Sequence, residues 1–205
     1  DHVNSTPRQV NIFGALGAEL PKFAHVPMIL GADGERLSKR HGAVSVTQYR
    51  DDGFLPEALT NYLARLGWSH GDAEIFSMGE FEAWFDLAHV SRSPAQFDPD
   101  KLAWLNQHYL QQAASERLAR LVEPVMIRLG MSLERGPALE PVVAMLKNRA
   151  TTINHLAEAA TLFYADGTPE PSLLEPHLTE ALLPALRMLK ARLSEAPVWD
   201  RPTLG

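Results

Sequence analysis

The chain has 205 residues, of which 45% are hydrophobic and none is cysteine, and it carries 19 Lys and Arg against 25 Asp and Glu. This composition excludes a largely disordered chain and a disulfide-stabilised scaffold, and the formal charge of −6 excludes a nonspecific nucleic-acid coat. Any contact with RNA must therefore come from local basic patches.

The front of the chain is expected to hold one helix, one strand and a turn. A capping box with a following proline begins at Thr6, so a helix is expected from there to about Gly17. The apolar run 23–30 has the length of a strand, and Pro27 indicates an edge or an irregular strand. The glycines in the stretch 31–34 predict a turn.

Short helices are expected next. A serine with glutamine three residues later predicts a capped helix at Ser45, and Pro56 begins another. A third capping box pairs Ser77 with Glu80, and Asp98 followed by proline opens a fourth helix. The spacing of these signals predicts a compact helical module.

The rest of the chain is typical of longer helices. Apolar residues at helical spacing over 118–129 predict one amphipathic helix with a kink at Pro124. The stretch 139–165 predicts two helices, the second capped by a threonine, and a last helix over 178–193 is interrupted by Pro184. The expected fold is therefore mainly α.

A basic loop bounded by Gly34 and Gly42 has the composition most typical of phosphate chemistry. It holds the cations Arg36, Lys39 and Arg40 directly after an apolar strand. Such side chains stabilise phosphate oxygens, and the glycines let the backbone close over a ligand. On composition alone, however, a solvated basic turn is the better interpretation.

Several strings of the sequence resemble one family in order and spacing. RLSKRHGA, residues 36–43, resembles the KMSKS signature of class I aminoacyl-tRNA synthetases in its bacterial glutamyl form. DHVNSTPRQ, residues 1–9, resembles the segment that leads from the glutamate pocket of these enzymes to that loop. FAHVPMILGADGERLSKRHGA, FLPEALTNYLARLGWSHGD, FDPDKLAWLNQHYL and LKNRATT continue the resemblance. It covers essentially the whole chain and is strongest up to about residue 110.

The resemblance implies a part of a glutamate–tRNA ligase. In such enzymes glutamate attacks the α-phosphate of ATP to give an adenylate, and the glutamyl group then moves to the 3′ end of tRNA-Glu. Lys39 is the implied catalytic residue, because its ammonium group would stabilise charge on the leaving pyrophosphate. Asp1 and His2 lie at the edge of the implied glutamate and ATP pocket. The implied ATP contacts are Arg36, Leu37, Ser38, Lys39 and Arg40.

The resemblance also implies three parts of the chain. Residues 1–44 are the end of the class I nucleotide-binding α/β domain, residues 45–114 a helical stem-contact module, and residues 115–205 an all-α anticodon-binding subdomain. The implied tRNA contacts are Asn106, Gln107, Lys147, Arg149 and Thr151. ATP is the expected substrate, with Mg²⁺ implied by the chemistry, and no metal site is expected in this chain.

Other basic and aromatic residues have simpler interpretations. Arg117, Arg120 and Arg128 form a helical stripe that is either a solvated surface or a path for RNA backbone, and the first is the better interpretation. Four aromatic residues are expected in the core, namely Trp84, Phe85, Trp104 and Tyr109.

One motif of the family is missing. Class I chemistry needs a histidine pair at i and i+3, and the 8 histidines of this chain contain no such pair. We therefore expect a fragment that is cut before Asp1 and inactive by itself as a ligase. We also expect a cytoplasmic monomer without a DNA partner. A membrane partner is not expected, because no apolar run approaches the roughly 20 residues that span a bilayer.

Two other functions are weighed against this interpretation. A noncatalytic helical module that binds protein would use the basic loop only as a surface turn. The glutamine enzyme of the same family has a β-barrel as its anticodon-binding part, whereas residues 115–205 are expected to be helical.

Overall fold

The computed structural model describes residues 2–38, 45–134, 136–165 and 171–195. The chain divides into two compact units, Asp1–Ala165 and Asp166–Gly205. Both are helical where they are described, which confirms the predicted mainly α fold. The finer division at residues 44 and 114 stays a prediction.

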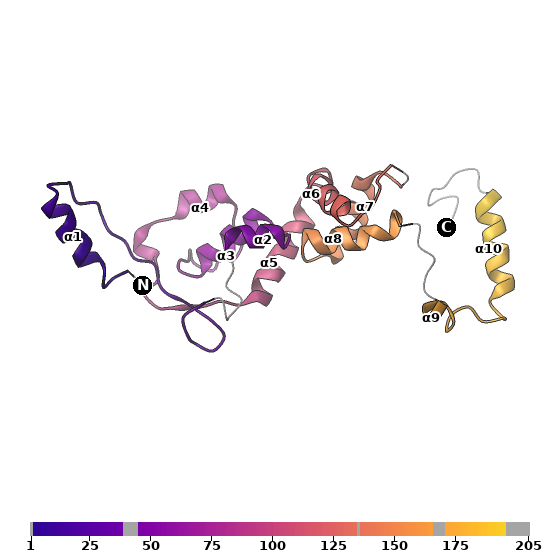
Figure 1. The fold of residues 1–205 in the computed structure, drawn as a ribbon, viewed down its shortest axis with the longest axis horizontal. Coiled ribbons are helices and arrows are strands. Elements are labelled where there is room, and N and C mark those ends of the chain that lie inside the picture. Colours follow the sequence, from indigo (N-terminus) through magenta and orange to yellow (C-terminus); the bar gives the residue numbers. More distant parts are fainter. Residues whose placement is uncertain (1, 39–44, 135, 166–170, 196–205) are drawn as a thin grey trace. The chain divides into compact units, whose positions relative to one another are not determined.

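The elements of the first unit are shown in Figure 1. Its helices are α1 (Thr6–Ala15), α2 (Val46–Asp51), α3 (Pro56–Arg65), α4 (Met78–Trp84), α5 (Pro99–Gln112), α6 (Ser115–Arg128), α7 (Leu139–Leu146) and α8 (Ile153–Ala160). The described residues of this unit also hold the 3₁₀ turns η2 (Leu87–His89), η3 (Lys147–Arg149) and η4 (Thr161–Phe163). The strands β1 (Ile29–Leu30) and β2 (Ala95–Gln96) pair in parallel, with Ile29 opposite Ala95. The second unit holds α9 (Pro171–Leu174) and α10 (Leu183–Glu195).

Three predicted helix caps are confirmed atom by atom. The Ser77 hydroxyl and the Glu80 carboxylate each accept the other's backbone N–H, which completes the capping box of α4. Asp98 accepts two backbone N–H groups at the start of α5, and Thr152 accepts the N–H of His155 at the start of α8. These side chains satisfy N–H groups that a helix cannot pair internally.

Other start and stop signals were wrong in detail. Ser5, not Thr6, is the N-cap of α1, and the Thr6 hydroxyl donates to the carbonyl oxygen of His2 at 3.0 Å. Ser45 precedes α2 but makes no capping bond, because its hydroxyl pairs with that of Thr47. Pro184 lies in the first turn of α10 rather than interrupting it, since proline fits where no N–H is needed.

The predicted strand over 23–30 is reduced to Ile29–Leu30. Pro27 has no N–H to donate, and the partner strand β2 is itself only two residues long. In the ladder the N–H of Ala95 donates to the carbonyl oxygen of Met28, and the N–H of Phe97 donates to that of Leu30. This short ladder ties the front segment to the residues that precede α5.

Two hydrophobic cores share α5. One core packs α3 against α5, through Leu59, Tyr62, Leu66, Leu102 and Leu105. The other packs α6 against α7 and α8, through the buried residues Leu118, Val122, Met126, Val143 and Leu156. Leu110 of α5 and Leu55 join this second core, so α5 carries the first core into the second. Pro124 is inside α6, which continues to Arg128.

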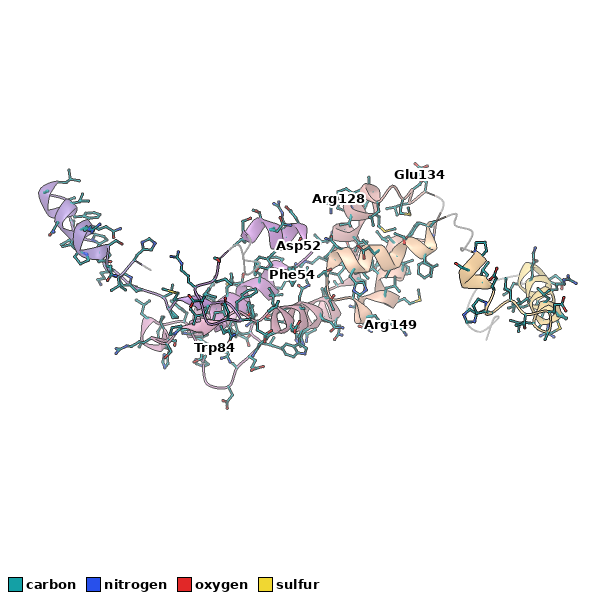
Figure 2. The ribbon with its side chains drawn as sticks, turned by 60° about the horizontal axis from the view of Figure 1, so that its bottom comes forward. Asp52, Phe54, Trp84, Arg128, Glu134 and Arg149 are labelled. Atoms are coloured by element: carbon teal, nitrogen blue, oxygen red, sulfur yellow. The ribbon has the colours of Figure 1, made fainter. Side chains whose placement is uncertain are left out.

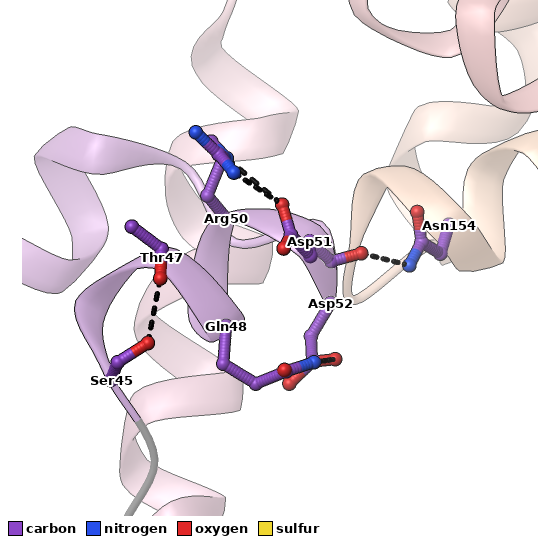
Figure 3. Close-up of polar contacts among 7 residues, drawn as sticks. All are labelled: Ser45, Thr47, Gln48, Arg50, Asp51, Asp52 and Asn154. Carbon is purple, nitrogen blue, oxygen red and sulfur yellow. Dashed lines mark hydrogen bonds and ion pairs between the residues drawn. The ribbon is translucent and has the colours of Figure 1, made fainter.

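Two hydrogen bonds to backbone carbonyl oxygens join the end of α2 to the start of α8. Figure 3 shows the one made by the side chain of Asn154. The Asn154 amide donates to the carbonyl oxygen of Asp51 at 2.8 Å. The N–H of Ile153 donates to the carbonyl oxygen of Gly53 at 2.9 Å. The C-terminal carbonyls of one helix thus meet the N-terminal donors of another, which complements both helix ends.

In the part of the chain that the structure describes, no helix has the length and apolar character needed to cross a membrane.

Candidate functional site

A cavity of about 660 Å³ lies beside the front segment of the chain. Its lining residues are His2, Thr6, Gln9, Phe23, Ala24, His25, Val26, Pro27, Met28, Ile29, Arg36 and Leu37. The structure therefore brings His2, predicted at the edge of a glutamate and ATP pocket, to the same cavity as two residues of the predicted ATP loop. Asp1, Lys39 and Arg40 lie outside the described residues.

A tight turn returns the chain from β1 to this cavity. Leu30 and Arg36 form an antiparallel bridge, and the N–H of Leu37 donates to the carbonyl oxygen of Ile29 at 2.9 Å. Gly34 has a φ of +78°, a backbone conformation that favours glycine. The reversal places the exposed Arg36 and the half-buried Leu37 against the cavity, and half-buried Ser38 follows them.

The cavity lining includes polar groups that sequence analysis did not assign to a site. The Thr6 hydroxyl lies 3.3 Å from Nε2 of His25, and both residues line the cavity. Gln9 is one turn further along α1 on the same lining. The signal was present in the sequence, because His25 interrupts the apolar run 23–30. A histidine, a hydroxyl, an amide and a guanidinium can together hold an anionic polar ligand.

The predicted RNA contacts gather where α5 meets η3. Gln107 donates to the carbonyl oxygen of Asn148 at 3.4 Å, and Lys147 donates to that of Ala113 at 2.8 Å. Arg149 is exposed and Thr151 is half-buried. Arg149 is labelled in Figure 2. The structure thus brings four of the five predicted residues to one junction with exposed surface.

Asn106 has a different place. Its side chain is 0% exposed, its Oδ1 accepts the N–H of Leu55 at 2.8 Å and its Nδ2 donates to the carbonyl oxygen of Thr151 at 2.6 Å. A buried amide with both ends paired has no surface for RNA. Asn106 ties α5 to Leu55 and to Thr151, and we leave it out of the RNA-contact set.

The arginine stripe of α6 is largely paired. Arg117 makes a two-point ion pair with Glu57 of α3, with Nη2 to Oε2 at 3.0 Å, and Arg120 pairs with Glu116. Burial alone would raise the pKa of Glu57, but the hydrogen bonds and charge of Arg117 hold this pKa below its ordinary value. Arg128, labelled in Figure 2, is exposed. The pairing favours a structural role for Arg117 over RNA contact.

The aromatic residues divide between core and surface. Tyr109 is half-buried, and its hydroxyl donates to Asn61 and to the carbonyl oxygen of Phe76, each at 2.8 Å. Trp84 is half-buried and stacks on His70, with ring centroids 4.6 Å apart. Phe85 and Trp104 were expected in the core, but they are 44% and 50% exposed. On α5 the buried side carries Leu102 and Leu105, and at about 100° per residue Trp104 falls on the other side.

Metal ligands do not cluster in the ranges that the structure covers. Among the described residues, no group of three or more His, Asp or Glu could hold a metal ion.

Two family descriptions match the chain. The family "tRNA synthetases class I (E and Q), catalytic domain" matches residues 1–104, and the family "Anticodon binding domain" matches residues 117–205. The first match includes the cavity, and the second includes most of α6 and all of α7 and α8.

Curated relatives align over the whole chain. The glutamate–tRNA ligase of Herminiimonas arsenicoxydans is 55% identical over 205 residues, and that of Janthinobacterium sp. (strain Marseille) is 56% identical over 205 residues. In both cases the alignment covers 100% of this chain and 44% of the relative. The chain therefore spans less than half the length of these relatives.

A solved structure has the same fold. The crystal structure of a glutamate tRNA ligase from Elizabethkingia meningosepticum, in complex with its amino acid, aligns with a TM-score of 0.76 at 27% identity. The alignment covers 96% of this chain and 43% of that one.

Proposed function

Because the chain belongs to the class I tRNA synthetases of the E and Q type, we propose that it works as the C-terminal part of a glutamate–tRNA ligase. In this reaction the glutamate carboxylate attacks the α-phosphate of ATP, and pyrophosphate leaves. The glutamyl group then moves from the adenylate to the terminal adenosine of tRNA-Glu, and AMP leaves. The chain contributes the ATP-phosphate loop and helices that bind the tRNA.

One observation carries this proposal. His2 and Arg36, which the resemblance puts at the glutamate side and in the ATP loop, line the same cavity. A cavity of about 660 Å³ that joins these two segments suits a ligand with both carboxylate and phosphate groups. Arg36 offers a guanidinium for phosphate oxygens, and Lys39 offers the ammonium group that lowers the barrier to loss of pyrophosphate. The roles of Lys39, Leu37, Ser38 and Arg40 rest on the resemblance.

The helical part supports a tRNA partner. The anticodon-binding family matches residues 117–205, and Gln107, Lys147, Arg149 and Thr151 gather where α5 meets that part. Amide, hydroxyl and cationic side chains such as these can contact RNA phosphates, and phosphate contacts position a nucleic acid without reading its sequence. We propose these four residues as contacts to tRNA-Glu.

The two alternatives fit less well. A noncatalytic interaction module does not account for the catalytic family match over residues 1–104. A glutamine enzyme would need a β-barrel after residue 115, whereas the described residues there are helices without a strand. Mg²⁺ bound to the ATP phosphates, a monomeric state and a cytoplasmic location complete the proposal.

The test compares two lysines in a protein of full family length that contains this chain. We expect Lys39→Ala to slow glutamate-dependent exchange of ATP and pyrophosphate at least about tenfold, which corresponds to roughly 1.4 kcal/mol. Lys22→Ala is the matched control, because Lys22 is an exposed lysine before β1. An unchanged rate for Lys39→Ala would favour the noncatalytic module.

A further inference from the structure

One side of α5 is turned away from both cores and carries an unusual set of side chains. Trp104 is 50% exposed, and the ring of His108 lies 6.2 Å from its ring. At about 100° per residue, Gln107 and Gln111 fall on the same side of the helix. The opposite side carries the buried Leu102 and Leu105. A tryptophan exposed among amides and a histidine is not explained by packing.

This side of α5 is continuous with the cations of η3. Gln107 and Gln111 both donate to the carbonyl oxygen of Asn148, at 3.4 and 3.2 Å. The ammonium group of Lys147 is held at 2.8 Å from the carbonyl oxygen of Ala113, at the C-terminal end of α5. Arg149 follows in the same turn and is exposed. These contacts fix the two segments as one surface.

The surface has a charge opposite to that of the chain. The chain has 25 Asp and Glu, yet the stretches 103–115 and 141–157 contain none. They contain instead Lys147, Arg149 and two histidines. In a protein of net charge −6, a surface built from two stretches that lack Asp and Glu, and that holds cations and amide donors, suits a polyanion.

We propose that this surface, the α5–η3 face, binds an unpaired nucleotide of tRNA and that Trp104 stacks on its base. The α5–η3 face consists of Trp104, Gln107, His108, Gln111, Lys147 and Arg149. An exposed indole offers a flat ring to any base, while Arg149 and Lys147 attract the adjoining phosphates. A protein partner fits less well, because Trp104 is the one large apolar side chain among these six residues. The inference rests on the proposed function and names the residue that stacks on an RNA base.

The test measures binding of a tRNA-Glu transcript to the full 205-residue chain. A base stacked on an aromatic ring contributes roughly 1–3 kcal/mol, so we expect Trp104→Leu to raise Kd at least about fivefold. Trp104→Phe keeps an aromatic ring and is expected to stay within about twofold. Leu162→Ala, which shortens a side chain 81% exposed on η4, is the control and is expected to leave Kd unchanged.

Two further readouts separate stacking from a structural role. Arg149→Ala is expected to lower the slope of log Kd against log salt by about one, whereas Trp104→Leu leaves the slope unchanged. Addition of tRNA should quench tryptophan fluorescence in the unsubstituted chain, and Trp104→Phe should lose most of this quenching although it still binds. Circular dichroism of each variant confirms that its helices are intact.

The outcomes distinguish the inference from the proposed function. A chain that binds no tRNA contradicts the proposed RNA-binding role and this inference together. A chain that binds equally well with Trp104→Leu, or whose quenching survives Trp104→Phe, contradicts the inference alone. If Trp104→Leu loses helical structure and Trp104→Phe keeps the full quenching, Trp104 has a packing role. That result would also overturn the inference.

Discussion

The carbonyl oxygen of Gly53 accepts the backbone N–H of Ile153 at 2.9 Å, which joins the second residue after α2 to the first turn of α8. Gly53 has a φ of +88°, and a Cβ there would lie 2.7 Å from the backbone nitrogen of Asn154. A backbone atom cannot move aside as a side chain can. The close approach of two segments a hundred residues apart therefore requires glycine.

Gly53→Ala is expected to destabilise the chain by more than about 2 kcal/mol, because it adds a clash with backbone to the strain of a positive φ. Gly71→Ala is the matched control. Gly71 also has a positive φ, of +50°, but a Cβ there would meet nothing within 4 Å. We expect that change to cost about 1 kcal/mol. Urea unfolding measures both, and equal losses would contradict the packing argument.

The buried amide of Asn106 gives a second prediction. Asn106→Ala leaves the N–H of Leu55 and the carbonyl of Thr151 without their partner, at about 1–3 kcal/mol for each buried group. Gln107→Ala, on the next residue, removes only one long contact of 3.4 Å and should cost less than about 0.5 kcal/mol. Thermal unfolding of the two variants compares them. Similar midpoints would contradict the structural role assigned to the Asn106 amide.

Two serines before helices should respond differently to the same substitution. Ser77→Ala removes the capping box of α4 and is expected to cost about 1 kcal/mol. Ser45→Ala should change the free energy of unfolding little, because the Ser45 side chain makes no capping bond to α2. Chemical unfolding of both variants under identical conditions decides. A larger loss at Ser45 would refute the assigned caps.

The Glu57–Arg117 pair predicts a pH dependence. The pKa of Glu57 is lower in the folded chain than its ordinary value of 4.5, so its stabilisation is present above that pH and is lost as the pH falls. Glu57→Gln should cost about 1 kcal/mol at pH 7, since both side chains are partly exposed and solvent weakens the pair. The difference in free energy of unfolding between the unsubstituted chain and Glu57→Gln, measured by urea unfolding, should become smaller towards pH 3. A difference independent of pH would contradict the ion pair.

Local chemistry predicted the helix starts better than it predicted the strand or the surface. The caps at Ser77, Asp98 and Thr152 each need only a side chain and the next turn, and all three are confirmed. The strand over 23–30 depended on a partner far along the chain, and that partner is only Ala95–Gln96. The length of a strand depends on the strand with which it pairs. The hydrophobic periodicity of one segment carries no information about that distant partner.

The candidate site shows the same division. The glycine-bounded loop and His2 were predicted from residues and resemblance, whereas the place of His25 beside Thr6 needed the folded cavity. The resemblance implied an RNA contact for Asn106, yet Asn106 is buried between two backbone partners. Trp104 was predicted to be core because it is aromatic, although its position opposite Leu102 on α5 already indicated the surface.

The most direct test of the whole account is aminoacylation by a protein of full family length that contains this chain. It would be incubated with ATP and total tRNA, in parallel with labelled glutamate and labelled glutamine. We predict that labelled glutamate becomes esterified to tRNA and that glutamine does not. Charging with glutamine in place of glutamate, or no charging with either, would contradict the assignment.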